Sequence, residues 1–355
     1  MKLRHGLRQP GVTAALAAAL LFGVGAPLAK ALLDTIDPWM LAALLYLGSG
    51  IGLTLWRRWR HAPAVTLPRA ERRWLIGAVL AGGVVGPVLL MAGLAAMPAS
   101  GASLLLNAES VFTALIAWFV FKENVDARIA LGMGCIVAGA LWLSWPQHGL
   151  QFSGLWPALC VLGACLAWGI DNNLTRKVSL SDATWIASVK GLVAGSVNLV
   201  LALGLGAALP APRLLLFPIV GALLLGLLAY GVSLVLFVVA LRHLGAARTG
   251  AYFSVAPFIG ALLAVAMGDA FTAPLLGAVV LMALGVWLHL TERHEHAHEH
   301  LPQEHSHAHV HDDGHHRHDH TELVAPGTRH SHTHRHEPLA HSHPHAPDMH
   351  HPHRH

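Results

Sequence analysis

The sequence is poor in charged residues and in cysteine. Charged residues make up only 12% of the 355 residues, whereas hydrophobic residues make up 54%. A soluble globular chain carries about 25% charged residues, so this composition excludes an ordinary water-soluble domain and indicates an integral membrane protein. Cys135, Cys160 and Cys165 lie in apolar runs without a CxxC spacing. They are therefore interpreted as small buried side chains.

Motifs of the common enzyme classes are also missing. The sequence contains no HExxH, no GxSxG and no P-loop, so the protein is predicted not to be an enzyme. Without a nucleotide-binding domain, any uphill transport has to draw on an ion gradient. The formal net charge of +4 does not indicate nucleic-acid binding, because the basic residues lie between apolar segments, where they set topology.

Long apolar segments dominate the first 290 residues. A helix needs about 20 apolar residues to cross a bilayer core of about 30 Å, and ten segments meet this length. The sequence therefore predicts an all-α integral membrane protein with ten transmembrane helices. The predicted spans are 11–30, 38–56, 73–95, 98–121, 127–145, 154–175, 183–206, 214–240, 247–268 and 273–290.

The lysines and arginines predict the orientation of these spans. Fifteen of them lie in the N-terminal segment (1–10) and the even-numbered loops, whereas the odd-numbered loops carry only Lys30 and Arg213. By the positive-inside rule, both termini are predicted to be cytoplasmic, in a bacterial-type inner membrane. The basic and then apolar start, "MKLRHGLRQPGVTAALAAALLFGVGA", also resembles a signal peptide, whose removal would leave nine spans. An internal repeat argues against that alternative.

The repeat relates two halves of the chain. "LLFGVGAPLAK" (20–30) matches "LAWGIDNNLTRK" (166–177), and "LGMGCIVAGALWLSW" (131–145) matches "LGAVVLMALGVWLHL" (276–290). The nearly constant offset predicts one five-helix repeat over 11–145 and a second over 154–290. Because five is odd, the two repeats should have opposite orientations. Inverted repeats are typical of secondary transporters, with the substrate site near the midplane between the halves.

This organisation resembles the drug/metabolite transporter superfamily, specifically its EamA-type members. In that family each half carries a stretch of small residues that continues into an apolar helix and closes on an acidic residue. The matching stretches are "ASGASLLLNAESVFTALIAWFVFKE" (99–123) and "ARTGAYFSVAPFIGALLAVAMGD" (247–269), although Ser110 stands where the second stretch has Pro257. The resemblance implies a ten-helix carrier of a small solute, and it does not extend to the tail.

Ionisable side chains within spans are costly, so each is a functional candidate. Glu109 lies eleven residues beyond Pro98, and Lys190 lies eight residues beyond Asp182. At about 1.5 Å per residue, both lie well inside the membrane. Because they come from different halves and carry opposite charges, they are predicted to pair across a cavity. A carboxylate that binds and releases a proton could couple transport to a proton gradient. The alternative is a static ion pair between helices.

Further polar residues complete the predicted substrate-binding set. Asp171, Asn172 and Asn173 form a polar cluster near the end of the sixth span. It is interpreted either as a cytoplasmic gate or as an interfacial helix end in which Asp171 pairs with Arg176 or Lys177. The remaining candidates are Asn107, Asn198 and Tyr230.

The tail, 291–355, has a different composition. It holds 23 of the 28 histidines and ten of the 19 acidic residues, and it has many prolines and few apolar residues. This composition predicts a disordered cytoplasmic tail. Neutral imidazoles bind Zn, Ni, Co and Cu ions, although no cofactor is expected to be required for activity. The first twelve candidate ligands are His294, His296, His298, His300, His305, His307, His309, His311, His315, His316, His318 and His320.

Three functions remain open from the sequence. The first is a carrier for a small organic solute or metabolite, with the bilayer and a coupling proton as its other partners and the tail as an accessory metal-binding segment. The second is an exporter of Ni, Co or Zn ions, in which the tail collects the ion. The third is a membrane-tethered metal-binding protein that transports nothing; the number of spans disfavours it, because an anchor needs only one or two.

Overall fold

A computed structural model describes residues 10–121, 127–144, 152–207 and 216–290, together with the backbone of four short tail segments. The chain divides into a membrane unit, which contains all the helices that the structure describes, and a tail unit, Arg293–Ala346. Each unit is described separately.

The membrane unit is all-α, as predicted. Seven of its helices are long and apolar enough to cross a membrane, and two shorter apolar helices lie at 130–142 and 273–288. The longest of the seven, Leu216–Ala266, is interrupted at Gly245, whose φ of 76° and ψ of 177° are not helical. The described residues therefore contain ten helical segments, in agreement with the ten predicted spans.

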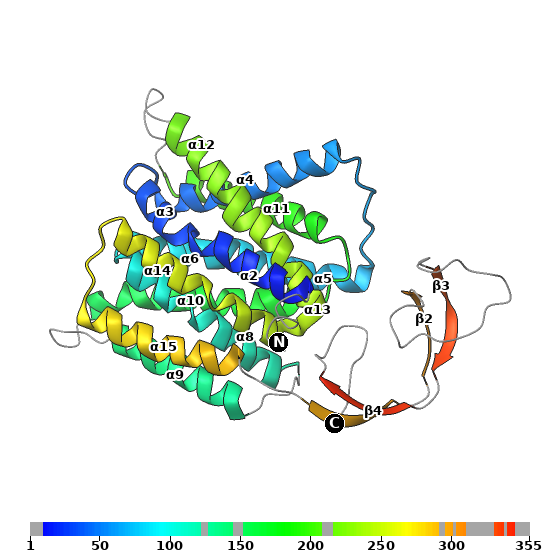
Figure 1. The fold of residues 1–355 in the computed structure, drawn as a ribbon. Helices are drawn as coiled ribbons and strands as arrows, with labels where there is room; N and C mark the ends of the chain where they lie inside the picture. The colour runs from blue at the N-terminus through cyan, green and yellow to red at the C-terminus, as the bar shows by residue number, and fades with distance from the viewer. Residues whose placement is uncertain are drawn as a thin grey trace. The chain divides into compact units, whose positions relative to one another are not determined.

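The first half contributes five of these segments (Figure 1). Asp37 begins the second segment as an N-cap, because its carboxylate accepts a hydrogen bond from Trp39 N and Pro38 occupies the first turn. The elements, grouped by segment, are α2 (Pro10–Gly23) with α3 (Gly25–Leu32); α4 (Pro38–Trp59); α5 (Arg69–Ala78), the π-helix η1 (Val79–Val85) and α6 (Gly86–Ala95); α7 (Ala99–Leu105) with α8 (Ala108–Phe119); and α9 (Ala127–Ser144).

The second half repeats this arrangement. Asp182 is the N-cap of its second segment and accepts a hydrogen bond from Trp185 N at 2.7 Å. Asp37 is the corresponding N-cap in the first half. The elements are α10 (Phe152–Arg176); α11 (Ala183–Gly204); α12 (Leu216–Leu225), the π-helix η2 (Gly226–Val232) and the first part of α13 (Ser233–Phe253); the rest of α13 with α14 (Ala256–Ala266); and α15 (Ala273–Leu290).

Irregularities and packing follow the same symmetry. Each half has a π-helical turn in its third segment and a break in its fourth, at Leu106–Asn107 and at Ser254–Val255. Helix α4 packs along α11, α9 along α15 and α7 against α14, so equivalent segments of the two halves pair with each other. The contact of α2 with α13 likewise matches that of α10 with α6. The first segment is thus an integral part of the bundle.

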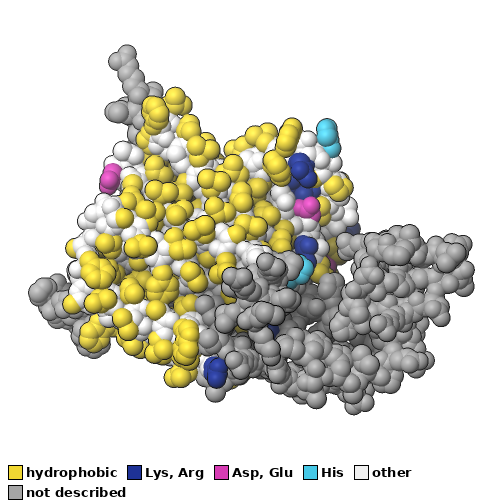
Figure 2. All heavy atoms as spheres, in the orientation of Figure 1, with side chains coloured by type: hydrophobic (Ala, Val, Ile, Leu, Met, Phe, Trp, Pro, Cys, Tyr) yellow, Lys and Arg dark blue, Asp and Glu magenta, His cyan; other side chains and the backbone are white. Residues whose placement is uncertain are grey.

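Apolar side chains cover the outside of the membrane unit. Phe217, Leu262 and Leu216 are 89%, 74% and 71% exposed, and hydrophobic side chains are spread over the face shown in Figure 2, with few charged ones. In water such a surface would be unfavourable, but against lipid chains it is not. The buried residues include small ones that allow backbones to approach closely. A Cβ on Gly191 of α11 would lie 2.6 Å from the Cα of Gly50 on α4.

The tail unit contains four short strands. Strand β1 (Glu295–His300) pairs antiparallel with β4 (Leu339–Pro344), and β2 (Gln303–His309) pairs antiparallel with β3 (His330–His336). The alternation of histidine with other residues has a period of two, which is also the period of a strand. The side chains of the tail histidines lie outside the described residues.

Candidate functional site

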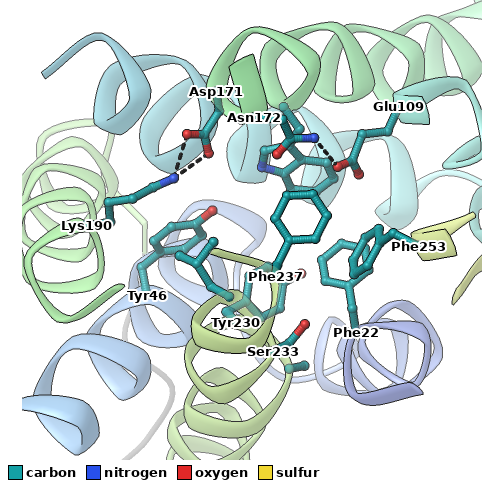
Figure 3. Close-up of a pocket in the computed structure, with 13 residues that line it drawn as sticks. Phe22, Tyr46, Glu109, Asp171, Asn172, Lys190, Tyr230, Ser233, Phe237 and Phe253 are labelled. Carbon is teal, nitrogen blue, oxygen red and sulfur yellow. Dashed lines mark hydrogen bonds and ion pairs between the residues drawn. The ribbon is translucent and has the colours of Figure 1, made fainter. Parts of the chain in front are cut away.

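A cavity of about 60 Å³ lies between the two halves. Helices α2, α4 and α8 of the first half line it together with α10, α11, η2 and α13 of the second (Figure 3). Its charged wall residues are Glu109, Asp171 and Lys190. Ligand pockets usually measure about 300–1,000 Å³. In this conformation the cavity is therefore smaller than a usual ligand pocket, and a solute with several heavy atoms needs the halves to move apart.

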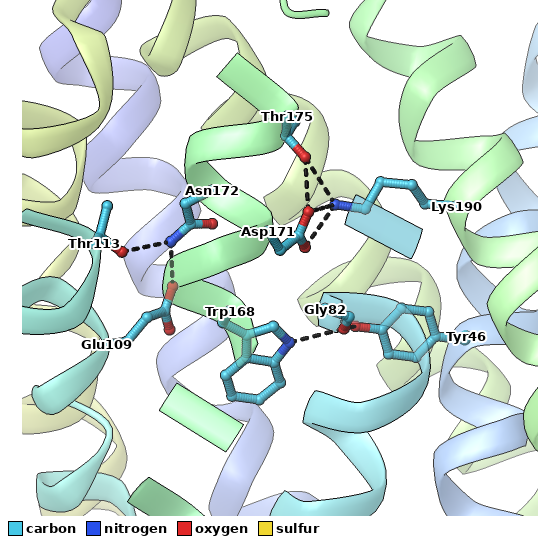
Figure 4. A network of polar contacts seen from close by, with 9 residues as sticks. All are labelled: Tyr46, Gly82, Glu109, Thr113, Trp168, Asp171, Asn172, Thr175 and Lys190. Carbon is cyan, nitrogen blue, oxygen red and sulfur yellow. Dashed lines mark hydrogen bonds and ion pairs between the residues drawn. The ribbon is translucent and has the colours of Figure 1, made fainter. Parts of the chain in front are cut away.

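Lys190 and Asp171 form a buried ion pair on one side of the cavity. Lys190 Nζ lies 2.5 and 2.7 Å from the two carboxylate oxygens of Asp171, and it donates a third hydrogen bond to Thr175 Oγ1 at 3.1 Å. Thr175, one turn beyond Asp171 on α10, donates to Asp171 Oδ1 at 2.7 Å. The two charged residues are only 1% and 5% exposed. All three N–H donors of the ammonium group are thus occupied within the protein (Figure 4).

Glu109 occupies the other side of the cavity. It lies in the first turn of α8, where the break in the fourth segment places a helix N-terminus inside the bundle, a position that favours negative charge. Its Oε1 accepts a hydrogen bond from Asn172 Nδ2 at 2.9 Å, whereas its second oxygen accepts none from a described residue. Asn172 also donates to Thr113 Oγ1 at 3.0 Å. These bonds join α8 of the first half to α10 of the second.

The π-helical turn of the first half is held by side chains from other segments. Gly82 O accepts hydrogen bonds from Tyr46 Oη at 2.6 Å and from Trp168 Nε1 at 2.9 Å. Asn198 Nδ2 donates to the adjacent carbonyl of Gly83 at 2.9 Å. A π-turn disrupts the regular backbone ladder and leaves carbonyls available for such donors. The polar atoms of Tyr46 and Trp168 are therefore engaged in fixing the helix, and their rings line the cavity.

Aromatic rings form much of the remaining wall. The ring centroid of Phe22 lies 5.7 Å from that of Trp168, 5.8 Å from Tyr230 and 5.2 Å from Phe253. Phe237 packs edge-on against Phe253 at 4.8 Å. The cavity is therefore an aromatic enclosure with carboxylates and an ammonium group in its wall (Figure 3).

Two further contacts join the halves at opposite ends of the bundle. Ser100 N, at the start of α7, donates to Asp269 Oδ2 at 2.7 Å. At the other end, Arg57 of α4 forms an ion pair of 2.6 Å with Asp182, the cap of α11. Because both ends are bridged, the conformation described is one in which the halves are closed together.

The predicted substrate-binding residues separate into two groups. Glu109, Asp171, Asn172, Lys190 and Tyr230 line the cavity, and their role in binding stays a prediction.

Three predicted residues lie elsewhere. Asn107 donates to Met282 Sδ at 3.7 Å, Asn173 donates to the backbone carbonyls of Thr113 and Gly169, and Asn198 supports the π-turn. These side chains tie helices together.

The predicted pairing of Glu109 with Lys190 is replaced by a different one. Lys190 pairs with Asp171, and both belong to the second half. Asp171 likewise does not serve as a partner for Arg176 or Lys177 at a helix end. The physical reason is rotation about the helix axis: α10 turns Asp171 towards α11, and Asn172, one residue on, towards Glu109 on α8.

The aromatic wall was not predicted. Phe22, Trp168, Phe237 and Phe253 lie in apolar spans, where an aromatic side chain facing lipid and one facing a cavity have the same hydropathy. The aligned Phe22 and Trp168 of the two repeats were the one available signal, and they do meet at the cavity.

No group of three or more metal-ligating side chains occurs among the described residues. The histidines predicted to bind metal lie outside the part of the chain whose side chains are described. The structure therefore leaves the metal-binding prediction for the tail untested.

A ten-segment bundle of two symmetric halves around a small, partly charged cavity is the architecture of a membrane carrier. Residues 9–145 match the model of the EamA-like transporter family. A "Probable 4-amino-4-deoxy-L-arabinose-phosphoundecaprenol flippase subunit ArnE" from Pseudomonas fluorescens is 34% identical over 86 residues, which cover 24% of this chain and 75% of that protein. The chain belongs to the EamA-like transporter family, and it is an integral membrane transporter of small solutes.

Two further comparisons cover more of the chain. An "Uncharacterized transporter" from Methanothermobacter thermautotrophicus is 28% identical over 273 residues, 72% of this chain and 78% of that protein. A solved structure described as "Crystal structure of protein" superposes with a TM-score of 0.62 over 79% of this chain and 96% of that chain, at 17% sequence identity. This likeness supports the fold alone.

Proposed function

We propose that the protein is a secondary-active carrier that binds a small organic solute in the cavity between its halves and couples solute movement to protons through Glu109. Its location is a bacterial-type inner membrane with both termini cytoplasmic, as the fifteen-to-two distribution of basic residues indicates. The observation that carries the proposal is a buried carboxylate that lines the cavity at the junction of the halves and has one oxygen without a hydrogen bond from a described residue.

The charge balance of the cavity supports proton coupling. Of its three charged wall residues, Asp171 and Lys190 neutralise each other, and Glu109 remains. An uncompensated charge inside the membrane is costly, so Glu109 is stable there when it binds a proton or an opposite charge. Solute and proton then bind Glu109 in turn, and the halves rearrange only when one of the two neutralises its charge. Movement of the solute is thereby coupled to movement of the proton.

Metal export is less well supported as the transport function. Among the described residues, those that line the cavity include no histidine and no cysteine. Zn, Ni and Co ions prefer several nitrogen, sulfur or oxygen ligands, whereas the cavity offers one open carboxylate among aromatic rings. The tail histidines are proposed instead to be an accessory metal-binding segment.

Removing residues 292–355 should leave transport of the organic solute unchanged, and the purified protein should still elute as a single symmetric peak on gel filtration. It should abolish the binding of several Zn or Ni ions, because the imidazoles are lost. Equilibrium dialysis with radioactive nickel, on full-length and truncated protein, measures this. Tight binding of several ions by the truncated protein would place a metal site in the membrane unit instead.

The coupling proposal is tested with purified full-length protein in proteoliposomes. An imposed pH gradient should drive accumulation of a radiolabelled solute from a panel of amines, amino acids and carboxylic acids, and a proton ionophore should abolish the accumulation. If a solute accumulates and the ionophore has no effect on this accumulation at any pH gradient, proton coupling is contradicted.

A further inference from the structure

The hydrogen bonds in the cavity distinguish its two kinds of charge. Lys190 Nζ has three hydrogen bonds, to Asp171 Oδ1, Asp171 Oδ2 and Thr175 Oγ1. An ammonium group has three donors, so none is left for an anionic solute. To recognise a carboxylate or phosphate here, the protein would have to break a fully satisfied buried ion pair. The cavity therefore disfavours anions.

Glu109 is in the opposite situation. Asn172 satisfies Oε1 at 2.9 Å, and the second oxygen accepts no hydrogen bond from a described residue. Three other polar wall residues already have partners, since Tyr46 and Trp168 donate to Gly82 O and Ser233 donates to Ala18 O. A neutral solute would leave the negative charge of Glu109 uncompensated. A solute with one positive charge would neutralise it.

The aromatic wall fits the same ligand. Cations are attracted to the faces of Trp, Tyr and Phe rings within about 6 Å. Phe22, Phe237 and Phe253 lie on the side of the cavity that Glu109 borders (Figure 3), and Trp168 and Tyr230 also line the cavity. The rings also favour an apolar or aromatic body attached to the charge. A divalent metal ion gains little from such walls, because they offer no ligand atoms.

We propose that the solute is a small monovalent organic cation, such as an amine that is protonated at neutral pH, and that its charged group binds between Glu109 and the aromatic wall. This proposal rests on the carrier function proposed above and specifies the substrate class of the same cavity. The cation takes the place of the proton on Glu109, so one positive charge leaves the site when the other binds.

Matched probes of different charge test the proposal on purified full-length protein. Benzylamine, benzyl alcohol and benzoate share one body, as do propylamine, 1-propanol and propionate. Tryptophan fluorescence and isothermal titration calorimetry at pH 7 measure their affinities. In at least one series the amine should bind about tenfold or more tightly than the alcohol, as expected for a cation–π contact together with an ion pair. The carboxylate should not bind.

Two variants locate the selectivity. Glu109→Gln should bind amine and alcohol about equally, whereas Glu71→Gln, on α5 outside the cavity, should keep the preference of the wild-type protein. Equal affinity for amine and alcohol in both series of the wild-type protein, or tighter binding of a carboxylate, would overturn the proposal.

Uptake of the same probes into proteoliposomes separates this proposal from the carrier function. Uptake of alcohols or acids without preference for amines would overturn the cation proposal and leave the carrier function standing. If the protein binds amines selectively but takes up none of the probes, the carrier function is overturned, and with it the proposal that the cation is transported.

Discussion

Replacing Glu109 by glutamine is expected to reduce gradient-driven uptake by about 100-fold. The amide keeps the size of the side chain, and its oxygen can still accept the hydrogen bond from Asn172. It cannot bind or release a proton, and it has no charge to offer a cation. Neutralising a charge inside a membrane is worth about 2.5–3.5 kcal/mol, which corresponds to roughly two orders of magnitude in an equilibrium or rate constant. Initial uptake rates of radiolabelled benzylamine into proteoliposomes measure the loss.

Glu71→Gln is the matched control for this experiment. It makes the same chemical change on α5, outside the cavity, and should transport within about twofold of the wild-type protein. A normal gel-filtration profile of Glu109→Gln shows that the loss of uptake is not a loss of folding. Gradient-driven uptake by Glu109→Gln within threefold of the wild-type rate would remove Glu109 from the coupling step.

Replacing Lys190 by methionine is expected to cause the largest loss of stability of any single change in the cavity. It leaves the carboxylate of Asp171 buried without its cation, and breaking a buried pair in this way costs about 3–5 kcal/mol. Asp171 would keep its bond from Thr175, but one hydroxyl does not replace an ammonium group that approaches both oxygens. Unfolding in mixed micelles with increasing dodecyl sulfate, followed by circular dichroism, measures the change.

The double variant Asp171→Asn/Lys190→Met should recover most of this stability. Removing both charges of a buried pair is often close to neutral, and the new asparagine can still bond to Thr175. The double variant should also retain uptake of amines, because Glu109 is unchanged. A double variant as unstable as the single one, or one without amine uptake, would show that the pair does more than join α10 to α11.

The fold was predictable because hydropathy and repetition both leave strong signals in the sequence. Apolar length located the ten segments, and the aligned ends of the two halves predicted their symmetric packing. The π-turns were not predicted, since "VLAGGVV" and "GLLAYGV" have the composition of ordinary apolar helix. Their geometry depends on donors from other segments, as at Gly82 O, and such donors are invisible to a local pattern.

The sequence predicted how deep the charged residues lie in the membrane, but not the direction in which their side chains point. Counting residues along a helix placed Glu109, Asp171 and Lys190 inside the membrane, and all three line the cavity. Rotation about each helix decides which of them meet, and it depends on how segments pack. Composition alone was also ambiguous for aromatics: Trp142 is 56% exposed on the outside of the bundle, whereas Trp168 is 6% exposed at the cavity.

The central claim is that a proton and an organic cation compete for Glu109. Proton release upon benzylamine binding, measured in weakly buffered solution with purified full-length protein, tests it directly. The pH is set just low enough that Glu109 is protonated before the amine is added. The account predicts release of about one proton per protein molecule on saturation, and none from Glu109→Gln. Saturable binding of benzylamine without proton release at any pH, or equal release from Glu109→Gln, would contradict it.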